Sequence, residues 1–244
     1  PLPDRVFGHG FLIRDGVKMG KSSGNAIDPV RLIELYGADA VRYYFLKEIE
    51  FGRDGVFEEE RFVNIVNADL ANDLGNLLNR TSKMVHKYFG GVLPEGEIPE
   101  ENVLRSRASG LCDRVTQAYD ALAFNAACEE ILTLVRMGNK YLDEQAPWSR
   151  YKKGETDAVG EILTAVLESV RIAAYLLSPI VPSVSSRIYQ QLGFSVDFSD
   201  SSLIDVSITF PNHSTWGILR ANHALPDPSP VFQKLELPSN DPST

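Results

Sequence analysis

Residues 58–89 read EEERFVNIVNADLANDLGNLLNRTSKMVHKYF, and this stretch decides the fold class. Its larger apolar side chains recur at steps of three and four residues, which is the spacing of one face of an α-helix. Acidic residues open the stretch, where they favour a helix N-terminus, and Gly90-Gly91 closes it. The pattern predicts one helix of about eight turns. Its buried face carries Phe62, Val66, Leu70, Leu74, Leu77, Thr81, Met84 and Tyr88.

The segments on either side divide the chain into three parts. Residues 1–57 combine a strand-like run, a glycine-punctuated loop and two short helices. Residues 58–195 continue the helical period beyond the long helix, which predicts a helical bundle and a mainly α fold class. Residues 196–244 are rich in proline, which predicts an extended tail that packs back on the body. We expect a strand over 6–13 and helices over 27–37, 38–48, 103–122, 125–143, 157–177 and 181–191.

Composition excludes several classes of protein. The 244 residues are 43% hydrophobic and 23% charged, as in an ordinary globular protein, and no apolar run approaches the ~20 residues of a membrane span. Two cysteines are too few for a disulfide framework or a zinc site. The net charge of −9 argues against nonspecific coating of nucleic acid. Residues 74–94, however, carry Arg80, Lys83 and Lys87 without an acid, and such a basic strip permits a specific contact with a polyanion.

A second informative stretch lies ahead of the bundle, where residues 14–25 read RDGVKMGKSSGN. Glycine, lysine and serine together indicate a phosphate-binding loop. The P-loop requires a glycine at position 15, where Asp15 stands, and the βαβ context is also missing. Two interpretations remain at this point: an ordinary solvated loop, or the loop of another class of nucleotide-binding enzyme.

The residues Lys18-Met19-Gly20-Lys21-Ser22 resemble the Lys-Met-Ser-Lys-Ser signature of class I aminoacyl-tRNA synthetases, with Gly20 in place of the first serine. The resemblance implies that Lys18 and Lys21 are catalytic. Their ammonium groups would stabilise the charge on the departing pyrophosphate when an amino-acid carboxylate attacks the α-phosphate of ATP. His9, between two glycines, either lines the ATP pocket or allows close strand packing. The expected ATP-binding residues are Lys18, Met19, Gly20, Lys21, Ser22 and His9.

Two stretches of the bundle carry side chains suited to reading RNA. Asn76 and Arg80 are four residues apart on the long helix and project side by side, offering an amide to a base edge and a guanidinium to a phosphate or base. The alternative is a local hydrogen bond or a solvated face. Trp148 follows Pro147, which ends a helix and holds the indole at its terminus as a stacking platform. The alternative is a tryptophan packed under the next helix.

The same stretches, NADLANDLGNLLNR (67–80) and YLDEQAPWSRYKK (141–153), resemble methionyl-tRNA synthetases, and the likeness extends from about Arg5 into the tail. It implies that Asn76, Arg80 and Trp148 bind the CAU anticodon of methionine tRNA, supported by Asp143 and Pro147. It also implies a methionine–tRNA ligase that uses ATP with Mg²⁺. Residues 1–57 would then be the end of the catalytic domain, and the bundle the anticodon-binding domain.

The rest of a class I synthetase is not found in this sequence. The His-Ile-Gly-His-type motif of the Rossmann half is missing, and two cysteines cannot form the family's zinc knuckle, so we expect no metal bound by this chain. The N-terminus lacks an initiator Met and a signal peptide. We therefore expect a C-terminal portion that is inactive alone and works in the cytoplasm, or in an organelle if a transit peptide preceded it. The alternatives are a non-catalytic tRNA-binding module or a class I synthetase for another amino acid.

Overall fold

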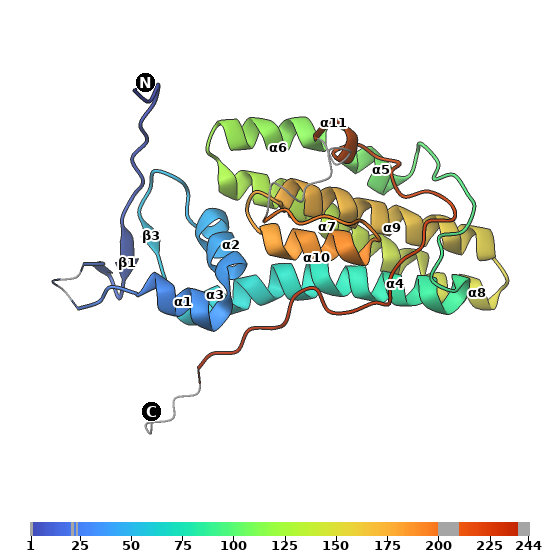
Figure 1. The fold of residues 1–244 in the computed structure, drawn as a ribbon, viewed down its shortest axis with the longest axis horizontal. Coiled ribbons are helices and arrows are strands. Elements are labelled where there is room, and N and C mark those ends of the chain that lie inside the picture. The colour runs from blue at the N-terminus through green and yellow to red at the C-terminus, as the bar shows by residue number, and fades with distance from the viewer. Residues whose placement is uncertain (1, 21, 23, 200–209, 239–244) are drawn as a thin grey trace.

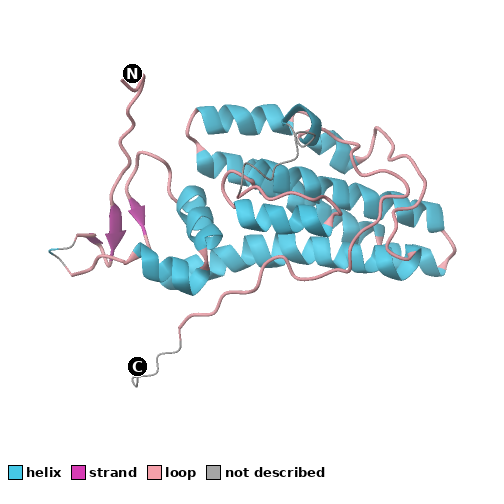
Figure 2. Cartoon of the chain, in the orientation of Figure 1, coloured by secondary structure: helices cyan, strands magenta, loops and turns pink. Residues whose placement is uncertain are grey.

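The computed structural model describes residues 2–20, 22, 24–199 and 210–238 of the chain (Figure 1). A small sheet and two short helices lie at the N-terminal end, and an elongated helical bundle follows. Strands occur only at that end of the described chain, and helices form nearly all of the rest of the regular structure (Figure 2). The predicted fold class, mainly α with a small α/β part ahead of a bundle, is confirmed.

The sheet is built from three short strands. β1 (Leu12–Arg14) pairs antiparallel with β2 (Val17–Lys18) and parallel with β3 (Gly55–Val56). Asp15 and Gly16 connect β1 to β2 with φ angles of 53° and 74°, the left-handed geometry of a two-residue hairpin turn. The predicted strand over 6–13 is wrong in extent, because pairing partners reach only as far back as Leu12.

The two helices expected after the loop are present. α1 (Pro29–Tyr36) begins at Asp28, whose carboxylate accepts a hydrogen bond of 2.9 Å from the backbone N–H of Val30. Gly37, at a φ of 83°, separates α1 from α2 (Ala38–Glu48). Both predicted ranges agree with the structure to within two residues at either end.

The long helix predicted over 58–89 is confirmed, with one correction at its centre. α3 (Glu59–Val66) and α4 (Asn76–Phe89) are α-helical, but the intervening η2 (Asn67–Gly75) has the wider turns of a π-helix. The backbone N–H of Asn76 accordingly bonds to the carbonyl of Ala71, five residues back. Within η2 both Asp69 and Leu70 are buried.

The remaining helices confirm most of the predicted periods. The single helix expected over 103–122 is wrong: Gly110, at a φ of 65°, interrupts it and divides it in two. A six-residue helix after Ala146 was not predicted. The elements are α5 (Val103–Ala108), α6 (Leu111–Asp120), α7 (Phe124–Gln145), α8 (Pro147–Lys152), α9 (Thr156–Leu177), α10 (Pro182–Gln191) and α11 (Phe210–His213).

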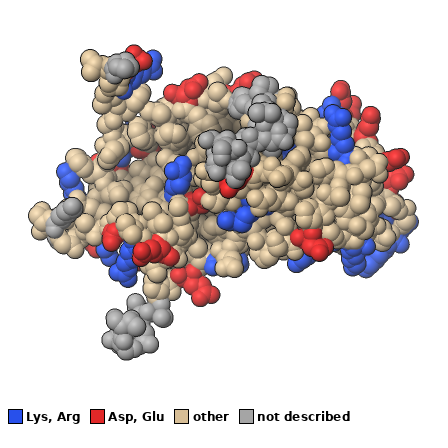
Figure 3. All heavy atoms as spheres, in the orientation of Figure 1, with Lys and Arg blue, Asp and Glu red and all other residues tan. Residues whose placement is uncertain are grey.

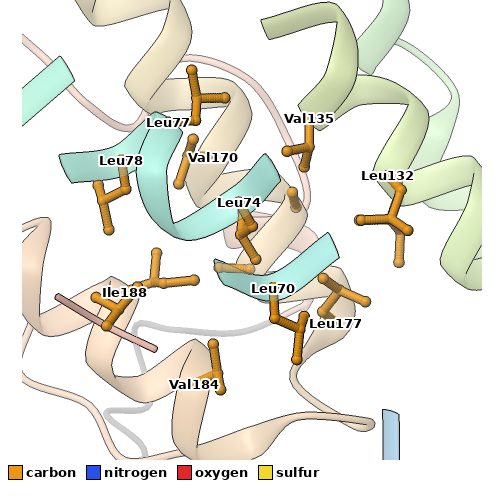
Figure 4. Packing of buried hydrophobic residues seen from close by; sticks show 14 of the residues in the cluster. Leu70, Leu74, Leu77, Leu78, Leu132, Val135, Val170, Leu177, Val184 and Ile188 are labelled. Atoms are coloured by element: carbon orange, nitrogen blue, oxygen red, sulfur yellow. The ribbon is translucent and has the colours of Figure 1, made fainter. Parts of the chain in front are cut away.

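The core of the bundle surrounds α9. Sixteen of its 22 residues are buried, so α9 is covered on almost every side by other helices. Leucines of η2 and α4 point toward residues of α7, α9 and α10 (Figure 4). Cys128 is fully buried in this core, and burial raises the pKa of its thiol to about 12, whereas Cys112 is half-buried. The residues labelled in Figure 4 are Leu70, Leu74, Leu77, Leu78, Leu132, Val135, Val170, Leu177, Val184 and Ile188.

The tail is held by a buried ion pair on α9. Glu168 and Arg171 have no exposed side-chain surface and form two hydrogen bonds, of 2.8 and 3.0 Å. Glu168 also accepts the backbone N–H groups of Gly217 and Ile218, at 2.6 and 2.8 Å. Arg171 donates to the carbonyl of His213 at 2.7 Å. The pair therefore satisfies backbone groups of the tail where these are removed from water.

The tail continues along the bundle toward the N-terminal end (Figure 1). Next to β-bridge partners Val92 and Ala224, the N–H of Leu93 donates to the carbonyl of His223 at 2.9 Å. Farther on, the side-chain amide of Asn67 bonds to both backbone groups of Leu235, at 2.7 and 2.9 Å. The boundaries after 57 and 195 stay predictions.

We predict that Glu168→Gln destabilises the fold by about 3–5 kcal/mol, because it leaves the buried Arg171 without its counter-charge and turns an amide N–H₂ toward backbone donors. Urea unfolding followed by far-UV circular dichroism measures the loss. Glu144→Gln, at an exposed ion pair with Lys140 on α7, is the matched control and should cost no more than about 0.5 kcal/mol. Equal unfolding midpoints for both variants would contradict the anchoring role of Glu168.

Candidate functional site

The lysine loop begins on the β1–β2 hairpin. Lys18 ends β2, and its ammonium nitrogen lies 3.2 Å from the centre of the Phe11 ring, a cation–π contact on an exposed surface. The N–H of Met19 donates to the carbonyl of Leu12 at 2.7 Å, which fixes the start of the loop against β1. Lys21 lies outside the described residues. Ser22 is exposed.

Asn25 closes this loop, and the sequence interpretation missed it. Its side-chain oxygen accepts a hydrogen bond of 3.0 Å from the N–H of Gly20, and its amide N–H₂ lies 3.3 Å from the carbonyl of Lys18. One side chain thus bonds to the backbone at the start and at the middle of the segment that carries the signature. The signal was available in the sequence, because asparagine after Ser-Gly is a residue type that bonds to nearby backbone in turns.

A cavity of about 620 Å³ opens beside the loop. His9, Met19 and Gly20 line it, so three of the residues expected to bind ATP share one concave surface. Gly10 serves a different purpose: a Cβ at this position would overlap the backbone carbonyl of Arg53, so the close approach of two chain segments requires glycine. The ATP-binding role of His9 stays a prediction. The apolar lining includes Phe11, Leu12, Ile27, Phe45, Phe51 and Phe124.

The second candidate surface lies on α4. Asn76 and Arg80 are both exposed and one turn apart, as predicted from their spacing. Arg80 does not bond to Asn76; its guanidinium donates to the carboxylate of Asp143 on α7 at 2.6 Å. Asp143 therefore orients the arginine directly and fixes α4 against the end of α7.

Trp148 lies just beyond the end of α7. That helix ends at Gln145, and Ala146 adopts a left-handed φ of 45° that reverses the chain direction locally. Pro147 then begins α8, so the proline opens a short helix as well as following the end of a long one. The indole is 41% exposed, which is not the enclosure expected of a tryptophan packed under the next helix. Arg150 braces the turn by donating to the carbonyl of Gln145 at 2.9 Å.

A network of charged side chains lies where α2, η2 and α7 meet. The buried Asp69 lies 3.1 Å from Arg136 and 3.4 Å from Lys47, and it accepts the hydroxyl of Tyr43 at 2.8 Å. Burial alone would lower the pKa of Lys47. Hydrogen bonds to Glu48 and Glu129 and the negative charges of Glu48 and Asp69 have a larger, opposite effect, so the pKa of Lys47 is raised. The ammonium therefore stays charged, and three helices are joined. The partners come from distant segments, so no local sequence pattern marked this network.

The described residues contain no group of three or more His, Cys, Asp or Glu side chains arranged to hold a metal ion. Among them, too, no helix combines the length and apolar character needed to cross a bilayer.

Two family profiles match the chain in succession. Residues 1–82 match the profile described as "tRNA synthetases class I (M)". Residues 93–240 match the profile described as "Anticodon binding domain of methionyl tRNA ligase". The first range carries the lysine loop together with Asn76 and Arg80, and the second carries Trp148.

Curated and solved proteins agree with the profiles. A methionine–tRNA ligase of Nostoc sp. is 55% identical over 243 residues, which is 98% of this chain and 45% of that protein. The chloroplastic/mitochondrial methionine–tRNA ligase of Arabidopsis thaliana is 42% identical over 97% of this chain and 38% of its own length.

Among solved structures, Mycobacterium tuberculosis methionyl-tRNA synthetase in complex with methionyl-adenylate superposes with a TM-score of 0.83 at 38% identity, covering 95% of this chain and 44% of the other. The chain thus spans about half the length of the relatives it matches. Because the anticodon-binding profile alone covers more than half of its residues, the chain belongs to the methionyl-tRNA ligase family.

Proposed function

We propose that this chain is the part of a methionine–tRNA ligase that supplies the lysine loop of the active site and the recognition of the CAU anticodon of methionine tRNA. The observation that carries the proposal is the pairing of two surfaces on one scaffold: a lysine loop beside a concave cavity at one end, and an exposed Asn76, Arg80 and Trp148 set at the other. The matches to both family profiles support it.

In the proposed reaction, the carboxylate of methionine attacks the α-phosphate of ATP, and pyrophosphate leaves. Negative charge grows on the leaving group, so cations aimed at it lower the barrier. Lys18 and Lys21 supply these cations, while Met19, Gly20, Ser22 and His9 shape the ATP-binding surface. In the structure the Lys18 ammonium nitrogen lies 3.2 Å from the centre of the Phe11 ring. Mg²⁺ accompanies ATP as part of the substrate.

In the proposed anticodon complex, the unstacked bases lie across α4 and the α7–α8 turn. The exposed amide of Asn76 offers a donor and an acceptor to one base edge, and the indole of Trp148 stacks on a base. Arg80 is oriented by Asp143 at 2.6 Å, so its guanidinium reaches the RNA without searching many rotamers. Residues 1–57, 58–195 and 196–244 would then be the catalytic end, the anticodon-binding domain and the returning tail.

The remaining parts of the reaction belong to a catalytic half with its own nucleotide-binding fold and methionine pocket, which this chain does not supply. We place the enzyme in the cytoplasm, or in an organelle if a transit peptide precedes the chain, as the name of the chloroplastic/mitochondrial Arabidopsis relative illustrates.

We predict that Lys21→Ala slows methionine-dependent ATP–pyrophosphate exchange about 10²-fold or more in kcat, with little change in the KM for methionine, because a cation used chiefly in the transition state is removed. The assay uses a chimera in which this chain replaces the matching half of the Nostoc methionine–tRNA ligase.

Lys140→Ala, on the exposed face of α7, is the control and should leave exchange unchanged. An unaltered kcat in Lys21→Ala would refute the catalytic role of that lysine. A chimera inactive with the wild-type loop, despite folding, would favour a non-catalytic tRNA-binding module instead.

We predict that Trp148→Ala removes most of the preference of the 244-residue chain for an RNA hairpin with a CAU loop over hairpins with altered anticodons. Loss of a stacking platform costs about 1–3 kcal/mol. Fluorescence anisotropy of labelled hairpins measures the dissociation constants. Trp148→Phe keeps an aromatic face and should retain more of the affinity than alanine. Equal binding of all hairpins by the wild-type chain would refute the methionine assignment.

A further inference from the structure

Two parts of the surface beyond the candidate anticodon residues are not explained by the proposed recognition. One is the continuation of the exposed face of α4. Asn76, Arg80, Lys83 and Lys87 follow one another at steps of four, three and four residues, so all four project from the same face of the helix. Lys83 and Lys87 are exposed, and neither forms an ion pair with any residue that the structure describes.

The other is a pair of tyrosines that joins α4 to α8. The rings of Tyr88 and Tyr151 stack with their centres 4.1 Å apart and their planes 19° from parallel. Tyr151 remains 38% exposed although Tyr88 covers one of its faces. Lys152 and Lys153 follow it directly and are exposed, again without an ion pair among the described residues.

These features form one surface. Two contacts join α4 to the chain around Trp148. Arg80 bonds to Asp143, which precedes Trp148 in the sequence, and Tyr88 stacks on Tyr151, which follows it. The lysines of α4 and of α8 therefore flank a single aromatic pair. Figure 3 shows Lys and Arg side chains gathered at this end of the bundle, over α8 and the end of α4. We name Lys83, Lys87, Tyr151, Lys152 and Lys153 the distal strip.

We propose that the distal strip binds single-stranded nucleotides of the tRNA loop that flank the anticodon, with the lysines on phosphates and Tyr151 stacked on a base. The inference rests on the proposed anticodon function and extends it. Three features favour RNA: cations without an ion pair on an acidic protein of net charge −9, a tyrosine that stays 38% exposed beside its stacking partner, and continuity with the Asn76–Arg80 face. Alternating cations and aromatic rings are the usual surface for single-stranded nucleic acid.

The proposed contact differs in kind from anticodon recognition. Lysines on phosphates carry no sequence information, and every base has a face on which a tyrosine can stack. The strip therefore adds affinity that is independent of the anticodon. The strip would hold the backbone of a tRNA loop while Asn76, Arg80 and Trp148 contact the anticodon bases and distinguish them.

The test measures binding of the 244-residue chain to two RNA hairpins, one with a CAU loop and one with an altered anticodon, over a range of salt concentrations. Lys83→Gln/Lys87→Gln should lower the affinity for both hairpins by the same factor, about tenfold at low salt. It should also reduce the magnitude of the slope of log K against log salt by about 1.4. The ratio between the two hairpins should stay unchanged. Arg31→Gln/Arg61→Gln, on α1 and α3 at the other end of the molecule, removes the same charge and should change neither quantity.

Tyr151 is tested with one variant that removes the aromatic ring and one that keeps it. Tyr151→Leu should lower the affinity for both hairpins by about 5- to 100-fold. Tyr151→Phe keeps the stacking face and should bind like the wild type. Thermal melting by circular dichroism checks that each variant is folded, and a Tyr151→Leu chain that melts early is replaced by Tyr151→Met.

Unchanged affinity and salt slope in the lysine double variant would overturn the proposal and point to another polyanion, such as an acidic protein. Equal losses in Tyr151→Phe and Tyr151→Leu would overturn the stacking contact. If the wild-type chain binds both hairpins equally, the anticodon assignment fails, but the losses in the strip variants still decide the present inference.

Discussion

The structure depends on the burial of α9. A helix with sixteen of 22 residues removed from water must be surrounded by other elements, and α7, α4, α8 and α10 provide most of that cover. Burial on every side also encloses Glu168 and Arg171, whose charges are costly in the interior unless they are paired and hydrogen-bonded. They bond to each other and to backbone groups of residues 213–219, so the position of the tail follows from the needs of two side chains on the central helix.

The same packing sets the distance between the two candidate surfaces. The helix formed by α3, η2 and α4 runs from the sheet end to the α8 end, a length of roughly 45 Å at the rise of an α-helix. Its inner face is fixed against α9, so its outer face cannot rotate, and Asn76 and Arg80 are held exposed. The π-helical centre turns Asp69 inward, where Lys47 and Arg136 hold it. The helix therefore fixes the spacing between the sheet end, which carries the lysine loop, and the exposed Asn76–Arg80 face, as the proposed binding of one tRNA at two distant points requires.

Much of this arrangement could be predicted because it depends on sequence patterns among neighbouring residues. The apolar repeat of residues 62–88, the Asp28-Pro29 helix start and the exposed Asn76–Arg80 spacing each depend on neighbours within one or two turns. What could not be predicted depends on partners far apart in the chain. Arg80 bonds to Asp143, 63 residues away, and Asp69 is buried only because charges from α2 and α7 meet it. Two local signals were present but unused: Asp15-Gly16 for the hairpin, and Gly110 for the break between α5 and α6.

The distribution of charge reconciles an acidic protein with the proposed binding of RNA. Many of the acidic side chains are engaged with arginine or lysine inside the bundle or between helices, as with Asp69, Glu130 and Glu168. Among the cations that form no ion pair in the described chain, Lys83 and Lys87 stand on the exposed face of α4, and Lys152 and Lys153 stand at the end of α8. The net charge of −9 repels a polyanion on average, so the proposed RNA would be disfavoured in orientations that miss the basic strip. A protein with excess positive charge would bind more RNA but distinguish orientations less well. Net acidity combined with a local basic strip therefore favours selective recognition over general affinity.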